Sequence, residues 1–133
     1  MLELKIRLDW SEMDMFQHIN NVSYFKFTQA NRLKILETVG LTKLFAETKI
    51  GPTLAHTECD FKQELNYPGN VYVRSSINEI KNTSFVIQHQ LFDDNQNLCA
   101  QALDVIVVYD YSNEKKHPIP EDIRMELSQL LVS

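Results

Sequence analysis

The sequence has few of the residues that mark metal, redox or disulfide-rich proteins. Its 133 residues include two cysteines, Cys59 and Cys99, which lie far apart and form no C-x-x-C pair. Zinc sites and thioredoxin-like redox sites usually need such pairs, so both classes are disfavoured. We therefore expect two packed free thiols and a cytoplasmic location, because disulfides are rare in reducing compartments.

Long apolar runs and strong positive charge are also missing. No stretch approaches the roughly 20 apolar residues of a transmembrane helix, and no basic segment with an apolar run signals secretion. The 13 Lys and Arg against 18 Asp and Glu give a formal net charge of -5. Nucleic acid is therefore disfavoured as a partner, because its binding needs clustered cations. A few local cations or a helix N-terminus would still suffice for a phosphate-bearing ligand.

The chain has no internal repeat, low-complexity tract or linker rich in proline and glycine, with only 4 Pro and 3 Gly. We expect one domain over residues 1–133. Alternating apolar and charged residues predict a strand over 2–8. A long apolar-rich run predicts a helix over 22–39, wrapped by other structure on more than one side. The predicted buried stripe of this helix is Val22, Phe25, Gln29, Leu33 and Leu36, widened by Tyr24, Phe27, Ala30 and Ile35.

Further strands and short helices follow the long helix. Turn-forming residues at 66–70, 81–83 and 93–97 separate strand-like segments. The predicted strands span 53–65, 71–80, 84–92 and 98–111, and the predicted short helices span 41–47 and 120–131. The nearly continuous apolar run within the last strand predicts that it lies inside the sheet. This order predicts an α+β fold, with an antiparallel five-stranded sheet wrapped around one long helix. Apolar surface left on the sheet predicts a homodimer or homotetramer.

The segment from Asp14 to Asn21 carries the strongest functional signal, because it places a carboxylate, an imidazole and two amides before the long helix. A helix start presents free backbone N–H groups and a partial positive charge. Such a pairing suits acyl transfer: the N–H groups hold a developing oxyanion while the carboxylate activates water or attacks directly. The alternative is that Asp14 is a loop residue that caps the helix.

The segment 12–24 reads E-x-D-x-x-Q-H-I-N-N-x-x-Y, and Arg32 follows on the helix. This pattern resembles the hotdog-fold thioesterases of the 4-hydroxybenzoyl-CoA thioesterase-like family. Phe61 and the segments 67–70 and 82–85 resemble later features of that family, so the resemblance spans nearly the whole chain. The chain departs from the family pattern in three places, at Glu12, Gln17 and Gln29. Gln17 replaces the glycine usual before the histidine, which affects rate and substrate range more than the fold.

The resemblance implies a hotdog fold and hydrolysis of an acyl-CoA or acyl-carrier-protein thioester to a free acid and a thiol. Asp14 would be the general base or the nucleophile, and the backbone N–H groups of Asn21 and Val22 would hold the oxyanion. Coenzyme A enters only as part of the substrate, and no metal or redox cofactor is expected. The acyl pocket would lie between the helix and a partner subunit's sheet.

The roles of the remaining candidate residues stay open. His18 orients the loop or touches the substrate, and Asn20 or Asn21 caps the helix. Tyr24 is a substrate, core or dimer contact. The resemblance places the pantetheine or nucleotide arm of coenzyme A beside Thr83 and Ser84, which are otherwise ordinary turn residues. Arg32 is a weaker candidate, as the partner of a carboxylate across the sheet. Lys62, Arg74 and Lys81 are weaker candidates for binding phosphates. We interpret His56, Glu58 and Asp60 as a polar strand face rather than a metal site.

Other functions fit the same fold. A non-catalytic acyl-CoA sensor would bind without turnover, although the presence of Asp14 argues against it. A hydratase or dehydratase would need a paired acid and base such as His18 and Asp14. An enzyme recruited to a carrier protein would need a basic patch to dock an acidic carrier, and none is evident in this acidic chain.

Overall fold

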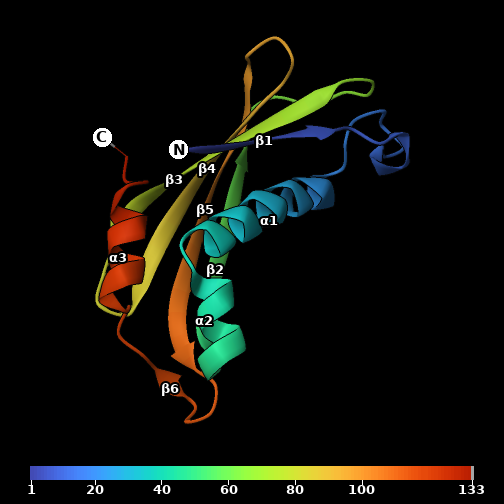
Figure 1. Ribbon diagram of the computed structural model, residues 1–133. Helices are drawn as coiled ribbons and strands as arrows, with labels where there is room; N and C mark the ends of the chain where they lie inside the picture. The colour runs from blue at the N-terminus through green and yellow to red at the C-terminus, as the bar shows by residue number, and fades with distance from the viewer. Residues whose placement is uncertain (133) are drawn as a thin grey trace.

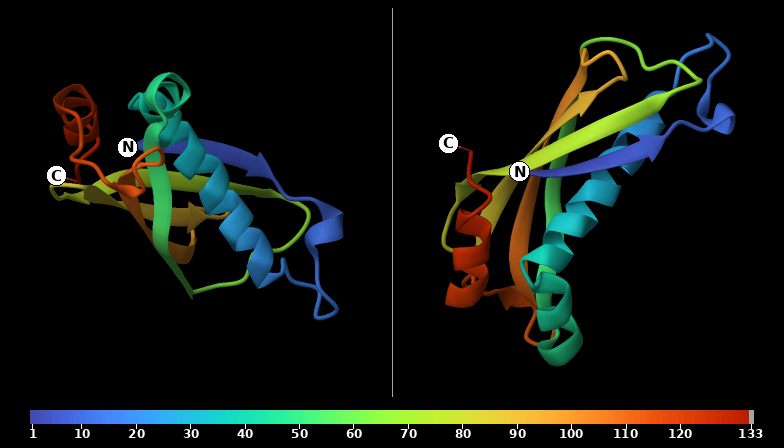
Figure 2. Two further views of the ribbon diagram at one scale, coloured as in Figure 1. Left: turned by 90° about the horizontal axis from the view of Figure 1, so that it is seen from below. Right: turned by 45° about the horizontal axis from the view of Figure 1, so that its top comes forward.

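The computed structural model describes residues 1–132, in which helices cover one face of an antiparallel sheet (Figures 1 and 2). The elements are β1 (Leu2–Arg7), the 3-10 helix η1 (Trp10–Glu12), α1 (Asn21–Thr38), α2 (Leu41–Thr48), β2 (Ile50–Phe61), β3 (Asn70–Ile80), β4 (Ser84–Phe92), β5 (Leu98–Asp110), β6 (Lys115–Lys116) and α3 (Glu121–Ser128). No helix within this range is both long and apolar enough to cross a membrane.

The sheet follows the order β1-β3-β4-β5-β2, and each neighbouring pair is antiparallel. The five predicted strands are confirmed, and the short strand β6 adds to them by pairing with β5. As predicted, β5 lies inside the sheet, between β4 and β2. The strands β1 and β2 form the two edges of the sheet. The sheet is curved, and α1 lies across it (Figure 1).

The apolar core has two parts that lie toward opposite ends of α1. Towards its end, Ile35 packs with Ile77 and Phe85 of the sheet and Leu127 of α3. Near its start, Tyr24 and Phe27 belong to a second cluster with Leu65, Val73 and Leu91. Every second residue of β4 is buried, because alternate side chains of a strand face the helix-covered side.

A chain of buried polar side chains joins α1 to the sheet. Asn31 Nδ2 donates to the carbonyl oxygens of Leu2 (3.0 Å) and Val73 (3.1 Å) and to Ser75 Oγ. Ser75 Oγ contacts His89 Nδ1, whose other ring nitrogen lies 2.7 Å from Asp104 Oδ2. Buried polar groups need such partners, because an unpaired one loses its hydration without compensation.

The far end of this chain is an ion pair. Arg32 Nη1 donates to Asp104 Oδ2 at 3.1 Å, and Thr57 Oγ1 donates to Asp104 Oδ1 at 2.7 Å. Arg32 therefore pairs with a carboxylate across the sheet, as predicted. We call Asn31, Ser75, His89, Asp104 and Arg32 the buried polar chain.

The predicted buried face of α1 is wrong in part. Val22, Phe25, Gln29 and Leu33 are exposed, whereas the buried residues are Ser23, Tyr24, Phe27, Thr28, Asn31, Ile35 and Leu36. The buried face of α1 contains polar residues that bond to the sheet or to the helix backbone. The spacing of apolar residues therefore predicts the neighbouring face instead. The exposed apolar face of α1 has no partner within residues 1–132.

Strand β2 also differs from its predicted range, since it spans Ile50–Phe61 rather than 53–65. It begins early because an edge strand tolerates proline, and Pro52 pairs opposite Val108. After Phe61 the chain leaves the ladder, because the N–H groups of Lys62 and Gln63 both donate to the carbonyl of Cys99. This exit turns the following residues towards the start of α1.

Candidate functional site

A cleft of about 620 Å³ opens at the start of α1. Three segments form it: the loop before α1, the first turn of α1, and the residues that follow β2. Its lining consists of Asp14, His18, Ile19, Asn21, Tyr24, Phe61, Lys62, Gln63 and Glu64. The structure therefore brings together most of the residues selected from the sequence motif.

Asp14 is held by its own loop. The loop closes through a hydrogen bond from Asp14 N to the carbonyl of His18 (2.8 Å), and Asp14 Oδ1 accepts from the N–H groups of Phe16 (2.9 Å) and His18 (3.3 Å). Asp14 Oδ2 has no hydrogen-bond partner among residues 1–132. Asp14 does not cap α1, so one carboxylate oxygen is fixed and the other is available to a ligand.

Gln17 adopts a left-handed backbone conformation in this loop, with φ of 68°. Glycine reaches that conformation without steric cost, whereas other residues are strained there. The departure from the family pattern thus falls at the residue where the backbone itself favours glycine. The loop keeps its shape in spite of Gln17, because the hydrogen bonds of Asp14 surround it.

The start of α1 is capped by Asn20. Its Oδ1 accepts from Ser23 N at 3.0 Å, and its Nδ2 donates to the carbonyl of Glu12 at 2.9 Å. The backbone N–H groups of Asn21 and Val22 make no hydrogen bond within residues 1–132. Two free donors therefore stand at the positive end of the helix dipole, and Asn21 lines the cleft beside Asp14.

His18 meets a carboxylate that the sequence motif did not reveal. Its Nε2 lies 3.0 Å from Glu64 Oε2, and both side chains are partly exposed. The backbone of His18 also closes the Asp14 loop, so this residue has a structural role and a ring in the cleft. No sequence signal identified Glu64, because the contact joins the loop before α1 to the segment after β2.

Tyr24 and Phe61 form the aromatic wall of the cleft. Their rings meet edge to face with centroids 5.0 Å apart, and Phe61 is 50% exposed. Tyr24 OH accepts from Leu65 N at 3.1 Å. Burial raises the pKa of Tyr24 above its usual value, so the phenol stays protonated. Tyr24 therefore anchors the segment after β2 and presents apolar surface rather than a base.

Thr83 and Ser84 do not lie in the cleft of the same chain. The cleft includes Phe61, which pairs with Ala100 of β5, whereas Ser84 pairs with Val107 of the same strand. These two levels of β5 are seven residues apart, which is roughly 23 Å along the strand at about 3.3 Å per residue. Within one chain the structure does not unite Thr83 and Ser84 with Asp14.

The remaining candidates fall away from the reaction centre. Arg74 bonds to Glu3 and Gln96, and Lys81 lies near Glu79, so Lys62 is the one predicted phosphate contact in the cleft. His56 pairs with Glu58 at 3.1 Å. Across residues 1–132, no three His, Cys, Asp or Glu side chains gather as a metal set.

The two cysteines are not activated. Burial is the main cause that raises the pKa of Cys59 to about 11, with carboxylates nearby as a further cause. Burial also raises the pKa of Cys99 to about 11. Both thiols therefore stay protonated at neutral pH. Because the thiolate is the reactive form, neither cysteine is suited to act as a nucleophile.

The fold is shared with solved structures of thioesterases. A predicted thioesterase from Bacillus stearothermophilus superposes with a TM-score of 0.89 at 26% identity, covering 98% of this chain and 96% of the other. A probable thioesterase from Escherichia coli gives 0.86 at 18% identity, covering 98% of each chain. A 1,4-dihydroxy-2-naphthoyl-CoA thioesterase from Synechocystis gives 0.84 at 14% identity, covering 96% of each. These likenesses confirm the hotdog fold.

Among curated proteins, none matches this chain. A family model does match, over residues 8–127, and its description is the thioesterase-like superfamily. The matched range contains the Asp14 loop, the capped start of α1 and every strand of the sheet except β1. The chain therefore belongs to the thioesterase-like superfamily.

Proposed function

We propose that this protein hydrolyses the thioester of an acyl-CoA, or of an acyl-carrier protein, to a free acid and a thiol. One observation carries the proposal: Asp14, which has a free carboxylate oxygen, and Asn21, whose backbone N–H is unbonded at the start of α1, line the same cleft. Membership of the thioesterase-like superfamily supports the same reaction class.

In the first step, the oxygen of a water attacks the thioester carbonyl carbon, and Asp14 takes a proton from that water. The carbonyl electron pair moves onto its oxygen, which accepts hydrogen bonds from the N–H groups of Asn21 and Val22. Each such donor contributes roughly 3–4 kcal/mol in related acyl-transfer sites. In the second step, this pair re-forms the carbonyl, and the C–S bond breaks with its electrons on sulfur.

The products are the carboxylic acid and a thiolate, and Asp14 returns its proton to the thiolate or to solvent. A thiolate is a good leaving group, so the step needs no strong general acid. His18 then serves mainly to hold the Asp14 loop. The alternative route gives the same products: Asp14 attacks the carbonyl, expels the thiolate and forms a mixed anhydride that water cleaves.

The proposal includes a homodimer or higher homo-oligomer. The apolar side chains of Val22, Phe25 and Leu33 are exposed on α1. Strand β2 is an edge strand of 12 residues whose outer hydrogen-bonding groups have no partner strand within residues 1–132. A second copy that covers these surfaces would close the acyl pocket with its sheet. Thr83 and Ser84 of that copy would then contact the substrate.

The test is thiol release from short, medium, long and aromatic acyl-CoAs by the wild type and by Asp14→Asn. This substitution keeps size and hydrogen bonding but removes the base or nucleophile. We expect turnover that falls by about a hundredfold or more in the variant. Asp122→Asn, an exposed carboxylate on α3, is the matched control and should retain full activity.

Two other outcomes would replace the proposal. Saturable acyl-CoA binding without thiol release by the wild type would identify a sensor. Addition of water to an enoyl-CoA, with the thioester intact, would identify a hydratase that pairs His18 with Asp14. Similar turnover by the wild type and Asp14→Asn would leave a thioesterase whose base is another residue.

A further inference from the structure

We propose that the nucleotide end of coenzyme A binds in a hollow formed by Arg7, Trp10 and Tyr67 at the end of β1. This inference rests on the proposed function, because it assigns a place to the part of the substrate that does not react. The hollow has a volume of about 360 Å³, and Leu8 and Asp9 complete its lining. That volume lies near the lower end of ligand pockets, roughly 300–1,000 Å³.

Trp10 offers a flat surface for a base. It is 70% exposed although it stands on ordered backbone, the 3-10 helix η1. Asp9 caps this helix by accepting from Ser11 N at 3.2 Å. Nucleic-acid bases stack readily on aromatic side chains, since every base has a π face. The second oxygen of Asp9 has no partner within residues 1–132 and can accept from the amino group of adenine.

Arg7 is the cation that fits a phosphate. The chain has four arginines, and three of them are engaged: Arg32 with Asp104, Arg74 with Glu3, and Arg124 with the carbonyl of Lys81. Arg7 makes no ion pair or side-chain hydrogen bond with the rest of residues 1–132. A guanidinium binds phosphate oxygens through paired N–H groups, so an unengaged one beside Trp10 suits a nucleotide.

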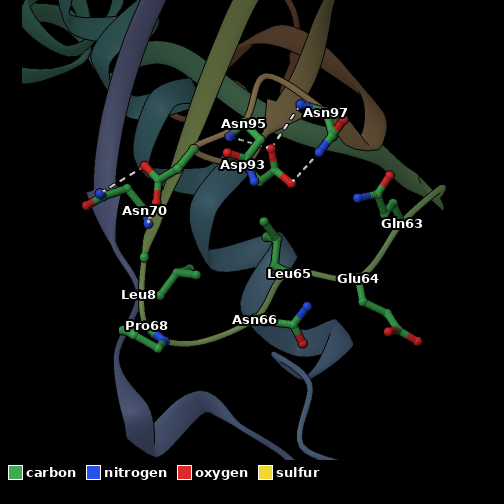
Figure 3. A pocket seen from close by; sticks show the side chains of 12 residues that line it. Leu8, Gln63, Glu64, Leu65, Asn66, Pro68, Asn70, Asp93, Asn95 and Asn97 are labelled. Atoms are coloured by element: carbon green, nitrogen blue, oxygen red, sulfur yellow. Dashed lines mark hydrogen bonds between the residues drawn. The ribbon is translucent and has the colours of Figure 1, made fainter.

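A second hollow of about 330 Å³ borders both the reaction cleft and the Trp10 hollow, and Figure 3 shows the side chains that line it. It shares Gln63 and Glu64 with the cleft and Leu8 with the Trp10 hollow. The side-chain amides of Gln63 and Asn66 line it and have no hydrogen-bond partner within the described chain. They match the amide groups of the pantetheine arm. An extended coenzyme A along the segment 63–69 would thus join Asp14 to Trp10.

The carboxylates of the middle hollow direct phosphates away from it. Asp94 accepts from the backbone and side chain of Asn70, at 3.0 and 3.1 Å, and these bonds lower the pKa of Asp94. Asp94 therefore stays negative at neutral pH and repels phosphate. The neutral pantetheine arm tolerates that charge, whereas the phosphates are better placed at Arg7.

The first test uses Trp10 as its own reporter, because it is the only tryptophan in the chain. Adenosine 3′,5′-bisphosphate and coenzyme A should each change its fluorescence saturably. Arg7→Ala should weaken both affinities about tenfold, while Lys116→Ala, an exposed cation on β6, should not change them. Calorimetric binding of coenzyme A with no change in Trp10 fluorescence would overturn the proposal.

The second test compares one acyl group on coenzyme A and on N-acetylcysteamine, which lacks the nucleotide. Arg7→Ala and Trp10→Ala should raise KM for the acyl-CoA about tenfold, with kcat and the KM of the short thioester unchanged. Trp10→Phe should recover part of the loss, because it keeps an aromatic face. Equal effects on both substrates would overturn the assignment, as would selective loss in Thr83→Ala or Ser84→Ala with none in Arg7→Ala.

Failure of the proposed function gives a different result. In that case the wild type cleaves neither thioester, and the fluorescence titration alone decides whether the hollow binds the nucleotide. Trp10 is largely exposed, so its replacement removes little packing, and an unchanged unfolding midpoint in urea would confirm that each variant is folded.

Discussion

The buried pair of His89 and Asp104 and the cleft pair of His18 and Glu64 have the same chemical groups in opposite surroundings. His89 and Asp104 are fully buried and 2.7 Å apart. His18 and Glu64 are 3.0 Å apart, with side chains 37% and 63% exposed. The first pair is bonded on all sides, whereas the second borders a cleft. Their surroundings, more than their composition, decide which pair can serve chemistry.

The buried pair is complete without a ligand. Burial alone would raise the pKa of Asp104, but hydrogen bonds from His89 and Thr57 and the charge of Arg32 lower it below its usual value. His89 Nε2 lies 2.7 Å from Asp104 Oδ2, and His89 Nδ1 contacts the Ser75 hydroxyl, which accepts from Asn31. Arg32 Nη1 lies 3.1 Å from Asp104 Oδ2, and Thr57 donates to Oδ1, so both ring nitrogens and both carboxylate oxygens have partners within the protein.

The largest effect should come from breaking the buried pair. Asp104→Ala leaves Arg32 and His89 without their acceptor, and removing one partner of a buried pair costs about 3–5 kcal/mol. Urea unfolding would measure this loss in the free energy of unfolding. A loss below about 1 kcal/mol would contradict the view that Asp104 holds the centre of the fold.

Acid should remove the contribution of Asp104 to the stability of the fold. Because the pKa of Asp104 is lower in the folded state than in the unfolded state, the unfolded chain binds its proton first. The contribution of Asp104 is therefore complete above the unfolded pKa of about 3.9 and is lost as pH falls through the lower folded value. Unfolding free energies from pH 6 to pH 2.5 should fall less steeply in Asp104→Asn than in wild type; parallel curves would refute this assignment.

A smaller effect is expected in the loop that carries Asp14. Gln17→Gly removes a side chain from a residue with φ of 68° and should raise the free energy of unfolding by about 1 kcal/mol. The control is Gln129→Gly, at a residue with φ of −70°, where the same change should give no gain. Urea unfolding of both variants distinguishes relief of backbone strain from a general effect of glycine.

The smallest effect should come from the cleft pair. Glu64→Gln removes the charge beside His18, and exposed ion pairs contribute at most about 1 kcal/mol. We expect little change in the unfolding midpoint. A loss comparable with that of Asp104→Ala would show that the cleft pair also holds the fold together, and would remove the contrast between the two regions.

The sequence predicted the regions where local pattern decides the structure. The five main strands follow alternation of apolar residues, and the loop of Asp14 follows a compact motif before a helix. Asn20 rather than Asn21 proved to be the cap, a choice that residue type alone left open. Such features depend on neighbours within a few residues, which a single sequence records directly.

The rest depends on contacts between distant segments. Glu64 reaches His18 from the exit of β2, and Asp104 meets His89 across neighbouring strands. The outward direction of Val22 on α1 was missed for the same reason, because the face that packs on the sheet includes polar residues such as Asn31. Apolar spacing cannot distinguish a face that meets the sheet from one that is left uncovered.

Phe61 has a consequence for how this protein can diverge. It is the last residue of an edge strand, where its backbone keeps the ladder whatever side chain it carries, and the residue is half exposed and lines the cleft. No member of the buried polar chain lines that cleft. Natural variation at position 61 can therefore reshape the wall of the cleft at little cost to folding, so the shape of the cleft and the stability of the fold are free to evolve separately.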